Sequence, residues 1–110
     1  MHTQIVTFTL EDLTEAGYVE LCEGLTAAYA RLPGLMAKVW LADVQRNTYG
    51  GVYFWRDQAS MEEYLASDIL RTVAASPHIQ EMDTNGFAVY EHLTRLTQPE
   101  CAIASLLVAG

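Results

Sequence analysis

The sequence predicts an α+β domain of the ferredoxin-like type, a split βαβ sandwich in which helices pack on an antiparallel sheet. Segments with period-2 alternation, typical of strands, interleave with two segments of helical periodicity. Their order is strand, helix, strand, strand, helix, strand, which is the split βαβ pattern. The chain has 110 residues, enough for one domain with its own core. We assign that domain to residues 1–97 and treat residues 98–110 as a separate apolar tail.

The composition narrows the class of protein further. Hydrophobic residues make up 51% and charged residues 18%, which excludes intrinsic disorder, and no apolar run is long enough to cross a bilayer. The 6 basic and 14 acidic side chains give a formal net charge of −8, and Lys38 is the single lysine. Nucleic acids and anionic membranes need basic counter-charge, so we expect neither as a partner. The N-terminal segment lacks the pattern of a secretory leader, so we expect a cytoplasmic protein.

The first two elements have clear signatures. Residues 2–10 alternate, with Ile5 and Thr7 on one face and Val6 and Phe8 on the other, and β-branched residues dominate, which predicts a strand. Asp12 then offers a helix N-cap with Glu15 three positions later, and Pro33 with Gly34 ends the helical run. Its apolar positions recur at helical spacing, at Tyr18, Leu21, Cys22, Leu25, Ala28, Tyr29 and Leu32.

The middle of the chain predicts a hairpin. Residues 35–44 and 49–56 alternate again, and the polar residues 45–48 connect them. Both strands are apolar on both faces, so we expect one face to cover helices and the other to meet a second copy of the chain. Two pairs of side chains share a face within their strands: Lys38 with Trp40, and Tyr53 with Trp55.

The last third predicts a second helical region and a bent strand. Ser60 and Glu63 form a capping box, Ser67 with Asp68 divides the helical stretch, and Pro77 closes it. Residues 79–83 and 86–94 then read as one strand hinged at residues 85–86. In that strand Phe87, Val89 and Glu91 would lie opposite Ala88, Tyr90 and His92. The tail is too apolar to remain in water, so we expect residues 98–110 to contribute to a homodimer.

The candidate site is aromatic. No phosphate-binding loop or nucleophile elbow occurs, and His2, His78 and His92 do not share one helix at ligand spacing, so we expect no metal. His92 is a candidate general base, because an imidazole titrates near neutral pH. Three roles are open to Lys38: its charged end reaches solvent at the rim of the sheet, it pairs with an acidic side chain across strands, or it holds an anionic group of a substrate. A pocket for a small hydrophobic or aromatic ligand would be lined by Lys38, Trp40, Tyr53, Trp55, Tyr64, Tyr90 and His92.

Several short motifs stand at fixed separations along the first 95 residues: Pro33-Gly34-Leu35, Lys38-Val39-Trp40, Gly50-Gly51-Val52-Tyr53-Phe54, then Asp57, Ser60 and Tyr64-Leu65. In these motifs the chain resembles the YdhR-type monooxygenase family, a branch of the dimeric α+β barrel superfamily. The resemblance implies a homodimer whose two sheets face each other, with a pocket in each subunit between sheet and helices. The positions that match the family are Lys38, Trp40, Tyr53 and Tyr64, whereas Trp55, Tyr90 and His92 are our own additions.

The family resemblance also implies an activity. It implies oxidation of a small electron-rich aromatic, a phenol or quinol, by dioxygen without a bound cofactor. A sister branch degrades haem, but Ala74 stands where that branch has its iron-ligating histidine and Tyr64 where it has a tryptophan. Two alternatives stay open: a dimeric carrier of small ligands without chemistry of its own, and an isomerase or cyclase acting on a polyketide-like substrate.

Overall fold

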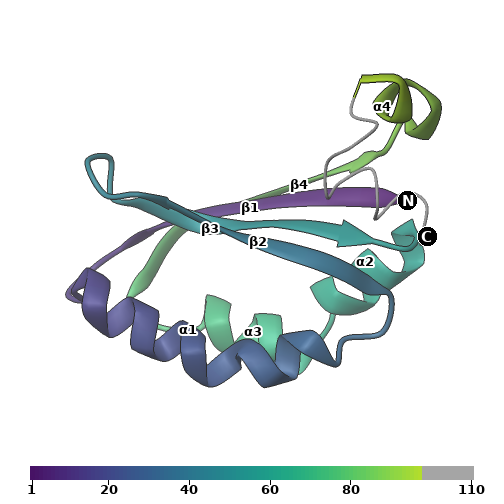
Figure 1. Ribbon diagram of the computed structural model, residues 1–110. Coiled ribbons are helices and arrows are strands. Elements are labelled where there is room, and N and C mark those ends of the chain that lie inside the picture. The colour runs from purple at the N-terminus through teal and green to yellow at the C-terminus, as the bar shows by residue number, and fades with distance from the viewer. Residues whose placement is uncertain (98–110) are drawn as a thin grey trace.

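The sheet has the predicted ferredoxin-like topology. The computed structural model describes residues 1–97, and its four strands pair antiparallel in the order β2-β3-β1-β4 (Figure 1). The α+β class and the split βαβ order are therefore confirmed. The elements are β1 (His2–Leu10), α1 (Glu15–Ala30), β2 (Leu35–Asp43), β3 (Thr48–Trp55), α2 (Gln58–Leu65), α3 (Asp68–Ala74), β4 (Ile79–Ala88) and α4 (Glu91–Thr97).

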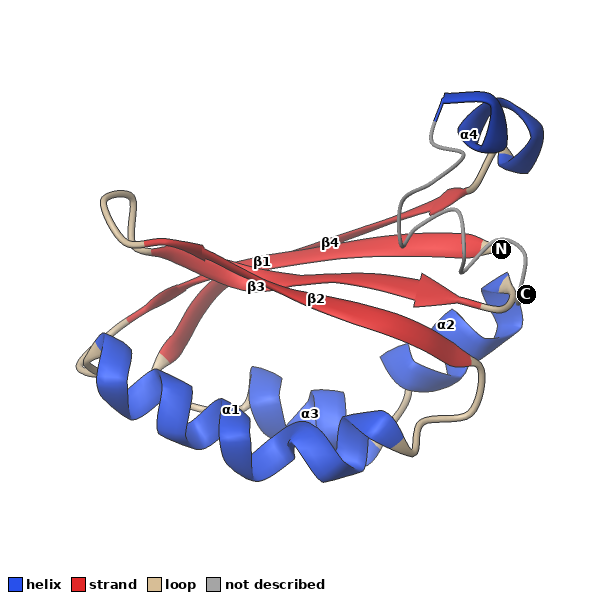
Figure 2. Ribbon diagram, viewed as in Figure 1, coloured by secondary structure: helices blue, strands red, loops and turns tan. Residues whose placement is uncertain are grey.

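The helices divide the molecule into a covered and an open side. Helices α1, α2 and α3 lie along one face of the sheet, and α4 stands on the opposite side beyond the end of β4 (Figure 2). Among the described residues no helix is long and apolar enough to span a membrane. The core lies between the sheet and the first three helices, and its buried hydrophobic members are Val6, Phe8, Leu10, Tyr18, Tyr29, Tyr49, Tyr53, Trp55, Met61, Tyr64 and Ile79.

The alternation in the sequence places the strand residues correctly. Val6 and Phe8 of β1 are buried against the helices, while Ile5 beside them is 37% exposed on the open face. Tyr53 and Trp55 share the covered face of β3, as predicted, and their rings stack with centroids 5.8 Å apart. The period of two thus decides which side chains reach the core.

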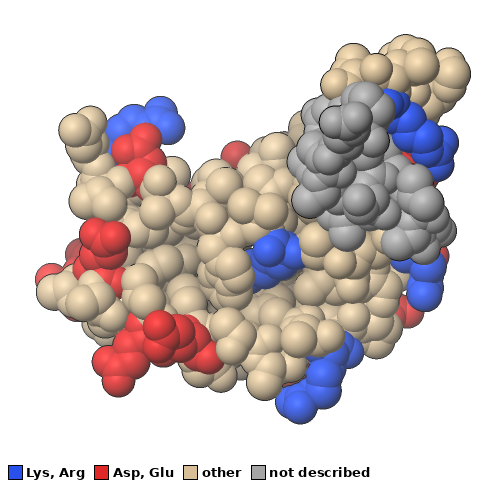
Figure 3. Space-filling model, viewed as in Figure 1, with Lys and Arg blue, Asp and Glu red and all other residues tan. Residues whose placement is uncertain are grey.

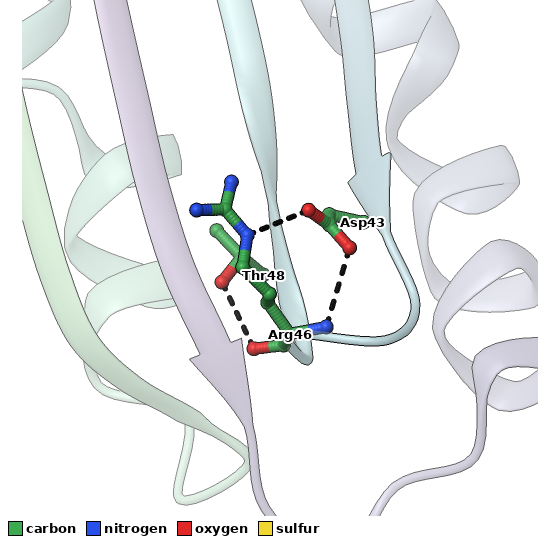
Figure 4. A network of polar contacts seen from close by, with 3 residues as sticks. All are labelled: Asp43, Arg46 and Thr48. Carbon is green, nitrogen blue, oxygen red and sulfur yellow. Dashed lines mark hydrogen bonds and ion pairs between the residues drawn. The ribbon is translucent and has the colours of Figure 1, made fainter.

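Two turns hold β2 in place. Gly34, before β2, has φ +78°, and a Cβ there would overlap Ser60 Oγ, so the turn requires glycine. After β2, Arg46 donates from its backbone N to Asp43 Oδ1 (3.2 Å) and from Nε to Oδ2 (2.7 Å), and Thr48 Oγ1 donates to the Arg46 carbonyl (Figure 4). The hydrogen bonds from Arg46 hold the pKa of Asp43 below its ordinary value.

Both predicted helix starts are wrong by two or three residues. Thr14, not Asp12, caps α1 by accepting from Gly17 N at 3.0 Å, because Asp12 adopts φ 55° in the preceding turn. Asp57, not Ser60, caps α2 by accepting from Ser60 N at 2.9 Å. The predicted break is confirmed, since Ser67 caps α3.

The end of the chain differs most from the prediction. Strand β4 continues through the supposed hinge to Ala88, and its irregularity lies instead opposite Thr7 and Thr9, near Glu81 with φ 53°. Glu91 to Thr97 form helix α4, not a strand. Glu91 pairs with Arg95 one turn later at 3.9 Å, a spacing that brings side chains together on a helix. The predicted dimer contact of residues 98–110 lies outside the described residues.

Candidate functional site

The side chain of Lys38 lies between aromatic rings. It leaves β2 on the covered face, where its Nζ is 3.4 Å from the centroid of the Tyr29 ring and 3.5 Å from that of Trp40. The Tyr53 ring follows at 4.7 Å. Space for the lysine comes from Gly51 on the neighbouring strand, since a Cβ there would lie 3.0 Å from Lys38 Cε. Cation–π attraction to three rings therefore holds the amine.

This environment changes the acidity of the amine. Burial lowers the pKa of Lys38 to about 7, an effect that the thiol of Cys22 only partly opposes. Within residues 1–97 no carboxylate forms an ion pair with Lys38. Aromatic rings stabilise an ammonium group less well than water or a carboxylate does. Burial among rings therefore favours the neutral form of the Lys38 amine. Near neutral pH a substantial fraction of the molecules therefore carries a free amine with an available lone pair.

Three tyrosine hydroxyls meet beneath the lysine. Tyr64 of α2 bonds through its hydroxyl to that of Tyr29 at 2.8 Å and to that of Tyr53 at 3.1 Å. Burial raises the pKa of both Tyr53 and Tyr64, so these phenols stay protonated. Each of the three hydroxyls has one proton to donate, and the two hydrogen bonds use two of these protons. One O–H therefore remains that can donate to a group entering the site.

The indole of Trp55 packs against the rings of Tyr53 and Tyr64. Its side chain is fully buried, and its Nε1 donates to Gln4 Oε1 at 2.9 Å. Gln4 is equally buried and donates from Nε2 to Thr84 Oγ1 at 2.9 Å. A buried amide with both ends satisfied fixes the tryptophan in one orientation. Trp55 thus fixes the position of the tyrosines from its own side of the cluster, and it does not border the space beside Lys38.

A groove between α1 and β2 gives access to the amine. It has a volume of about 250 Å³ beside Lys38, and past the Trp40 side chain it continues into a hollow of about 300 Å³. Deeper between sheet and helices the remaining space is only about 30 Å³, room for about one water. Figure 3 shows a small basic spot near the centre of this face, surrounded by uncharged side chains. We name this the α1/β2 groove, formed beside the amine by Thr26, Tyr29 and Ala30 of α1 and Met36, Lys38 and Trp40 of β2.

The predicted site residues fall into two groups. Five of them meet in one cluster: Lys38, Trp40, Tyr53, Trp55 and Tyr64. Tyr90 is 77% exposed, and His92 lies exposed on α4, across the sheet from the aromatic cluster (Figure 1). The expectation that these two line the same pocket is wrong, because residues 91–97 are helical and leave the sheet. Within residues 1–97 no three His, Cys, Asp or Glu side chains gather closely enough to hold a metal ion.

Two members of the cluster are absent from the sequence-based prediction of the site. Tyr29 stands out in the sequence only as part of the apolar stripe of its helix, although it provides the nearest ring to the amine and one hydroxyl of the tyrosine chain. Gln4 has a signal: it shares the inward face of its strand with Val6 and Phe8, where a polar residue needs a buried partner. The indole of Trp55 is a natural donor to such a residue.

The comparisons with known proteins agree with this fold. Residues 4–100 match the family model described as "Putative mono-oxygenase ydhR". A comparison with curated proteins finds no match. Among solved structures, SnoaB, a cofactor-independent oxygenase from Streptomyces nogalater, is similar with a TM-score of 0.64 and 21% identity over 80% of this chain and 91% of its own.

Two further solved structures have the same fold. A mutant of MhuD, with two manganese protoporphyrin IX molecules bound in each active site, has a TM-score of 0.66 and 14% identity over 82% of this chain and 95% of its own. NE2512, a protein of unknown function from Nitrosomonas europaea, has a TM-score of 0.69 and 14% identity over 81% of this chain and 88% of its own. At these identities the similarity shows the fold and not the chemistry.

Proposed function

The chain belongs to the ydhR mono-oxygenase family, and from that premise we propose that it oxidises a small electron-rich aromatic, a phenol or quinol, with dioxygen and without a bound cofactor. The single observation that carries this proposal is the amine of Lys38, held between ring faces beside an open groove. The groove lies at the small end of ligand-binding pockets, which suits a ligand of one or two rings.

The amine provides the base that the reaction needs. Neutral Lys38 accepts the phenolic proton, and the ammonium formed stays beside the phenolate as its counter-charge. Tyr29 and Trp40 flank the ring and exclude water, and an electron-rich phenolate passes electrons to dioxygen more readily than a phenol. A phenol plus dioxygen gives a quinone and water, so the substrate itself supplies the electrons. In this proposal Lys38 takes the role that the sequence assigned to His92.

Oxygen uptake tests the proposal. A panel of phenols and quinols is added to the protein in an oxygen electrode at neutral pH, with Lys38→Arg and Lys38→Met as variants. At least one compound should be consumed with equal uptake of oxygen. Lys38→Arg should lose about a hundredfold or more in turnover, because a guanidinium keeps the charge but does not accept a proton at this pH. Uptake equal in Lys38→Arg and wild type would exclude Lys38 as the base.

The same amine favours one other function, proton transfer in an isomerase or cyclase. A base beside an aromatic-lined groove moves a proton whether or not oxygen is present. Product formed under argon, at a rate that depends on Lys38, would establish this alternative. If the panel binds but nothing reacts in air or argon, the protein is a carrier.

A homodimer belongs to the same proposal. On the open face of the sheet Val39, Val52 and Ile5 stand side by side on adjacent strands, and Val39 is 50% and Phe87 53% exposed. An apolar sheet face without helices is typical of a surface covered by another chain. Sedimentation at micromolar concentration should give a dimer, and Val52→Lys should give monomers, while Val44→Lys in the hairpin turn should not. A wild-type monomer at all concentrations would contradict this assembly.

A further inference from the structure

The amine of Lys38 has a second kind of reactivity open to it. An uncharged primary amine is a nucleophile as well as a base. Within residues 1–97 no carboxylate forms an ion pair with Lys38 that would hold it protonated. The groove beside it, with a volume of about 250 Å³, can seat a ring. The reaction open to such a group is addition to the carbonyl carbon of a ligand.

We propose that Lys38 is a carbonyl-capturing site, whose amine condenses reversibly with an aromatic aldehyde seated in the α1/β2 groove to form an imine. The amine nitrogen adds to the carbonyl carbon, and the electron pair of the C=O bond moves to oxygen. One proton passes from nitrogen to that oxygen, and the hydroxyl group then leaves with the second N–H proton as water while the C=N bond forms. No oxidant or reductant takes part. The inference does not depend on the proposed oxidation of phenols.

The surroundings of Lys38 suit each stage of this reaction. The Tyr29 and Trp40 rings, 3.4 and 3.5 Å from Nζ, hold the amine at the wall of the groove, and Ala30 and Met36 offer apolar surface there to an aromatic aldehyde. The protonated imine that follows keeps a positive charge at the same nitrogen, and these rings stabilise it as they stabilise the ammonium. Burial, which lowers the pKa of Lys38 to about 7, keeps the attacking form available at neutral pH.

The chain is well suited to a clean test because Lys38 is its single lysine. The probe is 4-hydroxybenzaldehyde with sodium cyanoborohydride, which reduces an imine to a stable secondary amine. The protein is then cleaved, and mass spectrometry locates the added group. The α-amino group of Met1, which lies 3.6 Å from a carboxylate oxygen of Glu91, serves as an internal reference amine.

Five results are expected. Labelling of Lys38 should saturate with aldehyde concentration. It should be slowed by 4-methylphenol, which has the same ring but no carbonyl. The labelling rate should reach half its maximum near pH 7. Acetaldehyde, which lacks a ring, should label Lys38 at least tenfold more slowly. Lys38→Arg should abolish labelling at that position while the reference amine reacts as before.

Two variants separate a groove effect from ordinary amine chemistry. Trp40→Ala removes one ring face from a side chain that is already 40% exposed, so it should fold and should require at least tenfold more aldehyde for half-saturation. Arg31→Lys places a second lysine on the exposed end of α1, and it should label at least tenfold more slowly than Lys38. Equal labelling of these two lysines, or labelling of Lys38 that rises linearly without saturation, would overturn the proposal.

Discussion

The two edges of the sheet contrast sharply. At the β2 edge, Lys38 and Trp40 turn inward against α1 and border the groove. At the β4 edge most side chains are exposed and polar, including Gln80, Glu81 and Asp83. Both edge strands are of similar length and belong to the same sheet. What separates them is the long helix α1 beside β2, which supplies the aromatic wall that β4 lacks.

This contrast places the proposed chemistry at one edge only. The residues predicted for the site come from both edges, with Tyr90 and His92 following β4 and Lys38 belonging to β2. Experiments that compare matched changes at the two edges therefore test this assignment most directly.

The largest effect should separate Lys38 from His92. With any phenol or quinol that the wild type consumes, Lys38→Met should lower turnover about a hundredfold or more, because the proposed base is lost. His92→Ala should change turnover by less than about twofold, because that side chain is exposed on α4. Oxygen uptake by both variants checks this. A large loss in His92→Ala would mean that α4 contributes to a site, for instance that of a second subunit.

The next effect concerns the side-chain amide of Gln4, which links β1 to Trp55 of β3 and to Thr84 of β4. Gln4→Leu removes the acceptor of Trp55 Nε1 and the donor to Thr84 Oγ1. An unpaired buried N–H costs about 1–3 kcal/mol of the free energy of unfolding. Urea unfolding should report a loss in that range, whereas Gln58→Leu, a matched change at an exposed position of α2, should stay within about 0.5 kcal/mol. Equal effects would show that the buried amide contributes nothing.

A comparable effect on stability should appear in its pH dependence. The pKa of Lys38 is about 7 in the folded protein, below its ordinary 10.5, so between these values the unfolded chain binds more protons. Stability should therefore rise with pH from about 7 to about 10.5. Below pH 7 the cost of burying the charged amine is fully present. One pKa unit corresponds to about 1.4 kcal/mol, so a pKa of about 7 in the folded protein predicts a rise of several kcal/mol over this interval.

The variant Lys38→Met isolates this contribution. The difference in the free energy of unfolding between wild type and Lys38→Met, measured by urea unfolding at several pH values, should change only across that interval and in favour of the wild type at high pH. A difference that stays constant from about pH 6 to about pH 10 would mean that the lysine has an ordinary pKa.

The smallest effect should come from the β4 side. Tyr90 is 77% exposed, so Tyr90→Ala should change the free energy of unfolding by less than about 0.5 kcal/mol and leave oxygen uptake unchanged. Tyr53→Phe, which deletes one hydroxyl of the buried chain, should cost more, about 1 kcal/mol. Thermal unfolding of the two variants compares them. A larger loss in Tyr90→Ala would show that its ring is covered by something outside residues 1–97.

Much of the site could be predicted because strand periodicity is a local property. Alternation alone put Lys38 with Trp40 and Tyr53 with Trp55, and both pairs meet in the structure. Alternation failed after Ala88, where a short run of mixed polarity fits a strand or a helix equally well. There Glu91 and Arg95, four residues apart, form an ion pair across one turn of the helix.

The contacts between elements could not be predicted in the same way. Tyr29 lies on an element with a different period from that of Lys38, and only the packing of α1 on the sheet brings its ring to the amine. The shifted acidity of Lys38 likewise depends on which rings surround it. Sequence spacing indicates that a residue faces inward, but not what it faces.

The glycine at position 51 has a consequence for how this site could arise or be lost. A methyl group there would stand 3.0 Å from Lys38 Cε and 3.3 Å from Tyr53 Cε1, closer than side chains ordinarily approach. The flexible lysine would yield first, and a displacement of a few tenths of an ångström would change its fit between the rings. A single nucleotide substitution, from a glycine to an alanine codon, therefore suffices to disturb the position of this amine among the rings.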